Sequence, residues 1–323
     1  MVKDFDELHA IGELTKIEDP LVRYQEITRI NHNGDSFPIH SFEIGSDDPS
    51  APVLALFGGV HGLEKVGTQV VVTYLTSLFK QLSWDEELRR SLEKYRIISI
   101  PLINPWGMYH HRRSNANDVD LMRNAPVKAL EKKKFLLSGQ RLTPRLPWYQ
   151  GQENAAMEEE LQALVNYCRK NIFQAKRAIS VDFHSGFGLK DRLWYPYSKT
   201  LAPFKNITEM ENLEQLLNET HPHHIYQIEP TSESYTIEGD VWDYLYDEYI
   251  QENPDGVYIP LTLEMGSWIW VKKNPLQIFR REGLFNPIKS HRYDRTMRRH
   301  IMLIKFLFRA VGSSKAWVKE NSL

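Results

Sequence analysis

Residues 53–64 read VLALFGGVHGLE, and this stretch decides the fold. Its first five residues form an apolar run that is too short for a helix and that ends at two glycines, as a strand buried on both faces of a sheet does. In the next segment, from residue 65 to residue 82, apolar side chains recur every four positions and give the single apolar face of a helix. A buried strand that leads into such a helix is typical of α/β proteins.

Outward from this unit, the chain repeats the same two patterns. Alternating or apolar runs predict strands at 37–44, 96–100, 178–183 and 257–263. Helical periodicity follows at about 155–172, 207–219 and 293–310. No repeat and no flexible linker divides the sequence. We therefore expect one α/β domain over residues 1–323, with a central twisted mixed β-sheet flanked by helices.

Composition and charge narrow the class of protein. The chain has 323 residues, of which 41% are hydrophobic and 25% charged, as in ordinary globular proteins. The 40 Lys and Arg residues nearly balance the 42 Asp and Glu residues, so the net charge is −2. Proteins that bind nucleic acid without sequence preference rely on a basic field, and we therefore expect no nucleic-acid partner. The basic residues of segment 293–310 predict a solvated helix face, with a partner-binding patch as the alternative.

The sequence also bears on compartment and cofactor. The first residues, MVKDFDELH, include acidic side chains where an export signal needs an apolar stretch, and no apolar run approaches the roughly 20 residues that cross a bilayer. We expect a cytoplasmic protein with no membrane partner. The single cysteine, Cys168, excludes an intrachain disulfide and a cluster of thiolate ligands. A bound metal would have to use His and carboxylate side chains.

Polar residues able to bind a metal or move a proton lie at the ends of the expected strands. His61 and Glu64 follow the first strand, His184 follows a later one, and Glu264 ends the last. Ligands of open α/β sheets bind beyond the carboxyl ends of strands, so we expect these residues to share one crevice. An imidazole and a carboxylate three residues apart can ligate one ion. A chain with 12 His holds roughly one such pair by chance, so the strand and glycine turn before it give it weight.

These motifs carry a family resemblance. The segments GGVHGLE (58–64), DFHSG (182–186) and TLE (262–264) occur in the order and at the wide separations of the zinc carboxypeptidase superfamily. The chain resembles an M14-type metallohydrolase. More narrowly, NPWG (104–107), RR (112–113) and VDLMRN (119–124) are similar to the metallopeptidase-like DUF2817 group, which is related to succinylglutamate desuccinylase and aspartoacylase. The matches extend over about residues 52–268, and they imply the zinc carboxypeptidase fold.

The resemblance implies a metal centre with one Zn²⁺ ion. His61, Glu64 and His184 would be the zinc ligands, which leaves an open coordination position for water or substrate. Such a metal lowers the pKa of water and polarises a carbonyl. Glu264 would be the general base that takes a proton from the metal-activated water and passes it to the leaving nitrogen.

The resemblance also assigns residues to the substrate. Arg113 would be a cationic catalytic group beside the reacting carbonyl, and Tyr235 would donate from its phenol to the substrate amide. Arg123 would bind a substrate carboxylate through its guanidinium fork, with Asn124 as a further contact. Arg112 is adjacent to Arg113, and the spacing does not choose between them.

One position departs from the family pattern Asp-Leu-Asn-Arg-Asn. Residues 120–124 read DLMRN, so Met122 replaces the amide that would help Arg123 to hold a free carboxylate. A thioether is a weak acceptor and donates nothing. We therefore expect weak recognition of a C-terminal carboxylate, unless Asn115, Asn117 or Asn124 supplies the missing donor.

The leading hypothesis is a zinc-dependent hydrolase that cleaves an amide bond in the manner of a carboxypeptidase. A deacylase acting on N-acyl amino acids would use the same metal, water and base, so the substrate is a peptide or an N-acyl amino acid. The alternative from another class is a non-catalytic zinc- or ligand-binding protein of the same fold. The oligomeric state is left open by the sequence.

Overall fold

A computed structural model of the chain describes residues 3–131, 137–280 and 282–319. Within these ranges, eight strands form one sheet. The order across the sheet is β1-β2-β4-β3-β5-β8-β6-β7. The strands are β1 (Val22–His32), β2 (Asp35–Gly45), β3 (Val53–Gly58), β4 (Arg96–Ile100), β5 (Arg177–Ser185), β6 (Arg192–Tyr195), β7 (Gln227–Pro230) and β8 (Val257–Met265).

The sheet is mixed, and its parallel centre sets the position of the site. Strands β4, β3, β5 and β8 run parallel to one another, whereas β2 joins β4 and β6 joins β8 in antiparallel pairs. Every residue of β3 and β4 is buried, as expected for strands covered on both faces. The carboxyl ends of the four parallel strands therefore meet at one edge of the sheet, where they can deliver side chains to a common crevice.

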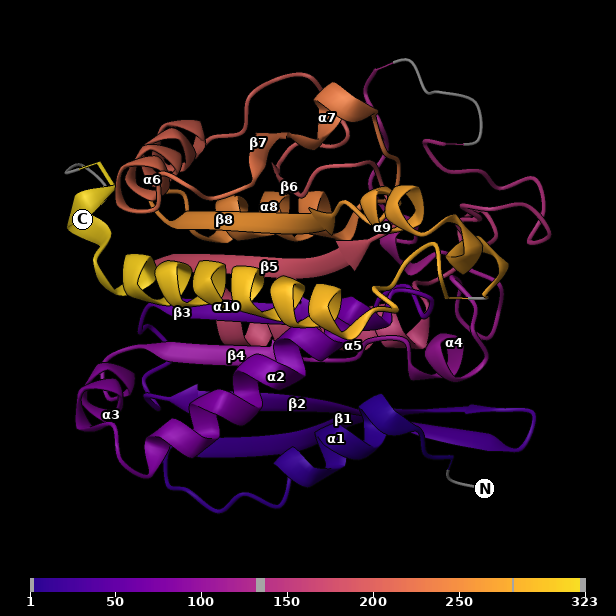
Figure 1. Cartoon of the computed structure of the whole chain (residues 1–323). Helices are drawn as coiled ribbons and strands as arrows, with labels where there is room; N and C mark the ends of the chain where they lie inside the picture. Colours follow the sequence, from indigo (N-terminus) through magenta and orange to yellow (C-terminus); the bar gives the residue numbers. More distant parts are fainter. Residues whose placement is uncertain (1–2, 132–136, 281, 320–323) are drawn as a thin grey trace.

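Helices cover both faces of the sheet (Figure 1). On the near face in Figure 1, α2 and α10 pack on β3 and β5, while α8 packs on β8 and against α5 behind the sheet. The α-helices are α1 (Asp6–Leu14), α2 (Lys65–Leu82), α3 (Glu86–Leu92), α4 (Pro105–Tyr109), α5 (Glu159–Ile172), α6 (Ile207–Thr220), α7 (Thr231–Ser234), α8 (Val241–Glu252), α9 (Trp268–Lys273) and α10 (Ser290–Gly312). Short 3₁₀ turns are η1 (Leu121–Arg123), η2 (Pro275–Phe279) and η3 (Ser314–Ala316). No described helix is both long enough and apolar enough to span a bilayer.

The turn after β3 depends on glycine. Gly59 has φ +66°, and a Cβ there would lie 2.5 Å from the Thr68 hydroxyl oxygen. Gly62 packs so closely on Gly107 that a Cβ would lie 2.1 Å from the Gly107 carbonyl carbon. These approaches bring the β3 turn against the segment that carries Arg113, whose carbonyl accepts from the Gly62 N–H at 3.3 Å. The glycine turn is thus the local reason that residues far apart in the chain meet at this edge.

The expected fold class is confirmed, with several additions. The expected strands at 37–44, 96–100, 178–183 and 257–263 correspond to β2, β4, β5 and β8, and the expected helices correspond to α2, α5, α6 and α10. Strands β5 and β8 run two residues further than expected, so that His184 and Glu264 lie within strands. The strands β1, β6 and β7 and the helix α8 were not expected from the sequence.

Candidate active site

His61 and Glu64 are brought together by a single tight turn between β3 and α2. The Glu64 N–H donates to the His61 carbonyl at 3.0 Å, which closes the turn. The side chains meet on the same side of it, with the His61 Nδ1 atom 3.0 Å from the Glu64 Oε1 atom. The three-residue spacing therefore acts through a turn that precedes the helix, and the helix begins only at Lys65.

His184 and Glu264 reach the same edge on neighbouring strands. They are register partners in the parallel pair β5–β8, so their side chains lie on the same face of the sheet. The His184 Nδ1 atom is 3.0 Å from the Glu64 Oε2 atom, and the Ser185 N–H donates to that same oxygen at 3.0 Å. Glu64 thus uses one carboxylate oxygen toward each histidine.

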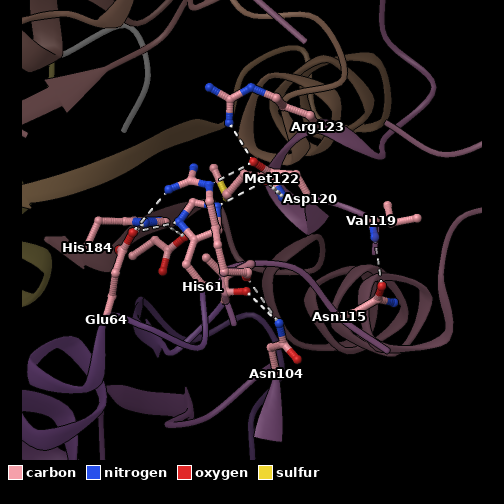
Figure 2. Close-up of polar contacts among 12 residues, drawn as sticks. His61, Glu64, Asn104, Asn115, Val119, Asp120, Met122, Arg123 and His184 are labelled. Atoms are coloured by element: carbon pink, nitrogen blue, oxygen red, sulfur yellow. Dashed lines mark hydrogen bonds and ion pairs between the residues drawn. The ribbon is translucent and has the colours of Figure 1, made fainter. Parts of the chain in front are cut away.

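His61, Glu64 and His184 form a compact group able to hold a metal ion (Figure 2). One ligand atom from each lies within 4.8 Å of the other two, and all three residues are buried. Donors of a tetrahedral zinc ion, with bonds of about 2.0–2.2 Å, lie about 3.3–3.6 Å apart. The 3.0 Å separations between each Nδ1 atom and the carboxylate are close to that spacing.

The outer nitrogens of both histidines also face carboxylates. The His61 Nε2 atom is 3.0 Å from Asp120 Oδ1, and the His184 Nε2 atom is 2.7 Å from Asp182 Oδ2. Asp182 is fixed in turn by the Trp242 indole N–H, which donates to it at 3.0 Å. Metal-binding histidines characteristically donate their outer N–H to a carboxylate, which fixes the ring and leaves the inner nitrogen free to ligate.

This donor set fits a cation on physical grounds. A neutral imidazole that donates from Nε2 presents only a lone pair at Nδ1, and a lone pair 3.0 Å from a carboxylate oxygen is repelled unless a positive charge lies between them. Protons can supply that charge when no metal is bound: although burial opposes it, Asp182 and Glu64 raise the pKa of His184 well above its usual range. A divalent ion held by His61, Glu64 and His184 would supply it with two neutral ligands and one carboxylate, which is a normal zinc set.

Glu264 differs from Glu64 in its electrostatic surroundings. Burial and the negative charge of Glu64 raise the pKa of Glu264 to about 8. For Glu64 itself, burial is outweighed by His61 and His184, and its pKa lies well below the ordinary range. One carboxyl group is therefore held ionised while its neighbour favours the proton, a contrast that separates a ligand from a proton-transfer group.

Two arginines share one aspartate beside this group. The Arg113 Nε–H donates to Asp120 Oδ2 at 3.0 Å, and an Arg113 Nη1–H donates to Glu64 Oε1 at 3.3 Å. Arg123 donates to the same Asp120 oxygen at 3.1 Å and to the Leu137 carbonyl at 3.3 Å. Although burial opposes it, these two cations hold the pKa of Asp120 well below its usual range. Arg113 retains 30% side-chain exposure, whereas Arg123 retains 3%.

The remaining sequence-predicted residues are placed in different ways. Arg112, which the sequence left as an alternative to Arg113, does not join the group: it pairs with Asp118 and lies 5.9 Å from the Trp106 ring centroid. Asn124 does not point to the group either. Its amide donates to the Gln150 carbonyl at 2.9 Å, and its oxygen accepts from a backbone N–H at 2.7 Å.

Tyr235 lies in a cluster of aromatic side chains. Its ring centroid is 6.1 Å from that of Phe187 and 6.1 Å from that of Trp194. Burial raises the pKa of the Tyr235 phenol, and the negative charge of Glu264 acts in the same direction while Arg123 opposes it. The ring is therefore in the electrostatic neighbourhood of both residues, and it is neutral near pH 7.

Met122 is buried among the polar side chains of the site (Figure 2). Its N–H donates to Asp120 Oδ1 at 3.2 Å, so the backbone of the unusual residue supports the aspartate behind His61. Its side chain supplies a thioether where the family pattern has an amide. This position thus adds no hydrogen-bond donor beside Arg123.

Sequence reasoning missed Asp120 and Asp182 as part of the site. For Asp182 the signal was present, because residues two apart on a strand share a face and Asp182 precedes His184 by two. Asp120 begins the segment 120–124 that carries part of the family resemblance, but the sequence does not show that its side chain faces His61. It is positioned by a loop that folds back through Asn115, whose side-chain oxygen accepts from the Val119 N–H at 3.1 Å (Figure 2).

Comparison with known proteins identifies a matching family and two related carboxypeptidases. Residues 16–269 match the family described as zinc carboxypeptidase. Carboxypeptidase SOL1 of Arabidopsis thaliana is 31% identical over 117 residues, which are 34% of this chain and 24% of that protein. Human carboxypeptidase D is 23% identical over 222 residues, 66% of this chain and 14% of that protein. The matched part of the chain thus spans about a quarter or less of the length of these relatives.

Solved structures share the fold at low identity. Bovine thrombin-activatable fibrinolysis inhibitor, in complex with tick carboxypeptidase inhibitor, superposes with a TM-score of 0.68 at 16% identity, over 96% of this chain and 98% of that one. Carboxypeptidase A of Helicoverpa armigera gives a TM-score of 0.66 at 17% identity, over 96% of this chain and 72% of the other. At this identity the likeness concerns the fold.

Proposed function

Because the chain belongs to the zinc carboxypeptidase family, we propose that it is a zinc-dependent hydrolase that removes the C-terminal residue of a peptide by cleaving an amide bond. The observation that carries the proposal is the paired arrangement of the two histidines. Their Nδ1 atoms converge on Glu64 at 3.0 Å, and their Nε2 atoms rest on buried carboxylates. A site built only for packing would not place carboxylates on both nitrogens of two adjacent rings.

The chain's own residues then account for catalysis. A zinc ion held by His61, Glu64 and His184 would act as a Lewis acid that lowers the pKa of water and polarises the scissile carbonyl. Glu264, on the adjacent strand, accepts the proton of the attacking water at its carboxylate and passes it to the leaving nitrogen. Its raised pKa suits a group that must both take and return a proton near neutral pH.

Arg113 is the cation available to the reacting carbonyl. Two of its N–H groups donate to Asp120 and Glu64. Its side chain remains partly exposed, so its other N–H groups are available to a substrate. Positive charge fixed in advance stabilises the oxyanion that develops during amide hydrolysis. Tyr235, neutral and in the cluster of aromatic side chains, would donate a hydrogen bond to the substrate.

A specific observation favours a second candidate function. Arg123 is almost fully buried and donates to Asp120 and to a backbone carbonyl, and Met122 beside it offers no donor. A substrate that lacks a free α-carboxylate would lose little binding free energy in such a site. The second candidate is therefore a deacylase or amidase that uses the same metal and base.

One screen separates the two candidates. The zinc-loaded protein would be assayed with peptides that carry a free C-terminal carboxylate, with the same peptides as C-terminal amides, and with N-acyl amino acids. Carboxypeptidase activity predicts hydrolysis of the first set with release of one amino acid. Turnover of the C-terminal amides, which lack a free α-carboxylate, at least as fast as of the free acids would replace the proposal by the deacylase or amidase. The absence of turnover in all three sets, with zinc bound, would leave a zinc-binding protein without this activity.

A further inference from the structure

A cationic pocket of about 340 Å³ opens between α9, the segment after β5 and the first half of α10. Three separate segments contribute its basic side chains, which are Lys190, Lys273, Arg292, Arg295 and Arg299. Four of them are exposed and Arg292 is half-buried. Among the described residues, none of the five forms an ion pair with a carboxylate. The basic face expected on the last helix is therefore not only a solvated surface, because part of it lines a pocket.

The pocket holds one carboxylate against these five cations. Asp191 is half-buried and already accepts from the Gly266 N–H at 2.9 Å. His300 lies 3.8 Å from it, but burial lowers the pKa of His300 to about 4, so this ring adds no charge at neutral pH. Like charges held in one concavity repel one another, and a multiply charged anion relieves that repulsion. Guanidinium groups bind carboxylates in particular through paired N–H donors.

The pocket lies close to the catalytic residues. Gly266, which donates to Asp191, is two residues after Glu264, so the Asp191 carboxylate is no more than about 9 Å from the Glu264 Cα atom. Trp268 binds the segment that joins the two groups: its N–H donates to the Gly188 carbonyl and its indole N–H to the Gly186 carbonyl, both within 3.0 Å. Gly186 follows His184 by two residues and Gly188 precedes Lys190 by two, so this short segment leads from the catalytic residues to the cations.

We propose that this pocket binds acidic side chains of the substrate upstream of the scissile bond. The inference rests on the proposed function. A carboxypeptidase holds one residue beyond the scissile bond, so the rest of the peptide must extend away from the catalytic residues on the other side of that bond. An extended chain advances about 3.3–3.6 Å per residue. Acidic residues three to five positions before the scissile bond then reach the pocket, and the preferred substrates are peptides with acidic residues at those positions.

Two matched peptides test the proposal with the zinc-loaded protein. They are Ac-Glu-Glu-Glu-Ala-Ala-Phe and Ac-Gln-Gln-Gln-Ala-Ala-Phe, which differ only in charge at the relevant positions. Each exposed ion pair changes binding by only a few-fold, so several together should raise kcat/KM for the Glu peptide by about tenfold at low salt. The preference should shrink in 0.5 M NaCl because exposed charges are screened.

Charge reversal locates the effect. Arg295→Glu and Lys273→Glu should each reduce the Glu-to-Gln ratio by about fivefold and leave kcat/KM for the Gln peptide within twofold. Arg298→Glu is the matched control. It makes the same charge reversal at an exposed position of the same helix, but Arg298 lines a different cavity. A ratio near one in the unmodified protein, or an equal loss with Arg298→Glu, would overturn the proposal.

A binding measurement separates this proposal from the proposed function. Fluorescence anisotropy of a labelled Glu peptide needs no turnover. Binding that Arg295→Glu weakens by about fivefold and Arg298→Glu preserves would support the pocket even if no peptide is cleaved, and the carboxypeptidase function alone would then fail. Equal binding by all variants would reject the pocket. Binding to phosphatidylglycerol vesicles that needs Arg295, without preference for the Glu peptide, would replace the peptide by a membrane surface.

Discussion

The four buried carboxyl groups at the site have different tasks, and burial alone does not distinguish them. Asp120 and Asp182 lie behind the rings and are fixed by arginines or by an indole N–H. Glu64 lies between the rings and is held ionised by them. Glu264 stands apart, without an ion pair among the described residues, and favours the proton. The carboxyl group that forms no ion pair among the described residues is the one best suited to exchange a proton during a reaction.

Replacing Glu264 by Gln tests this assignment. The change removes the proton acceptor but preserves the shape of the side chain, so zinc content should stay at the wild-type level while kcat falls by about 10²- to 10⁴-fold. Metal analysis and initial rates would be measured on the same sample. Glu248→Gln is the control, because Glu248 pairs with Arg169 away from the site. Activity within a few-fold of wild type would remove Glu264 from the mechanism.

Met122 gives a second test at the scale of one residue. Met122→Asn would add a donor beside Arg123, and a hydrogen bond to a charged group is worth about 1.5–3 kcal/mol. We expect kcat/KM to rise by about tenfold or more for substrates with a free α-carboxylate and to stay unchanged for their amides. Met122→Leu keeps the apolar volume and adds no donor, so both substrate sets should be unaffected. Equal gains on both sets would show that Met122 does not contact the substrate carboxylate.

At the scale of elements, α5 supports the loop that carries Asp120. The Asn115 side chain accepts from the Val119 N–H and donates to Glu160 Oε2 at 3.2 Å, at the start of the helix. Glu160 is buried, and burial raises its pKa to about 7. The support for the site therefore includes a carboxyl group that changes its protonation state near neutral pH.

Stability should depend on pH through Glu160 in a defined direction. Between pH 4.5 and pH 7 the native state keeps a proton that the unfolded state has lost, so the free energy of unfolding falls as pH rises through this window. Glu160→Gln cannot ionise, and above pH 7 it should be more stable than wild type by as much as about 3 kcal/mol, with no gain near pH 4.5. Urea unfolding at several pH values would measure this difference. The control is Glu153→Gln, at an exposed position of the preceding loop: its difference in stability from wild type should not change with pH in this window, and an equal change would exclude Glu160 as the source.

The sequence predicted the centre of the sheet better than its edges. Strands β3, β4, β5 and β8 are continuous apolar runs because both of their faces are covered, and that pattern is visible without a structure. β1 was missed because it is an edge strand whose exposed side chains mask the alternation, and β6 and β7 have only four residues each. Their places in the sheet come from tertiary pairing, which local pattern does not encode.

The same distinction applies to the site. His61, Glu64 and His184 could be found because each follows or ends a recognisable strand. The choice between Arg112 and Arg113 could not be made from the sequence, because neighbouring side chains of an irregular loop can point in different directions. Arg112 pairs with Asp118, whereas Arg113 pairs with Asp120. Loop residues of this kind are set by contacts distant in sequence.

For the whole molecule, the candidate metal site links segments from both halves of the chain. Its side chains come from the β3 turn and β5, Glu264 lies beside them on β8, and the supporting Asp120 comes from the loop after α4. Because one sheet carries all of these segments, an ion that binds only the folded state should stabilise the whole sheet and not a local loop.

Removing zinc should therefore lower the melting temperature in a single transition. A ligand present at 100 times its dissociation constant adds about 2.7 kcal/mol, which corresponds to several degrees in a protein of this size. Calorimetry with chelator and with added zinc would measure the shift, which should diminish as pH falls because protons compete for the histidines. His184→Ala should show neither bound zinc nor the shift, whereas His110→Ala, which removes a histidine paired with Asp35, should show both. An equal zinc-dependent shift in His184→Ala would place the metal elsewhere, because that variant lacks one of the two rings whose Nδ1 atoms converge on Glu64.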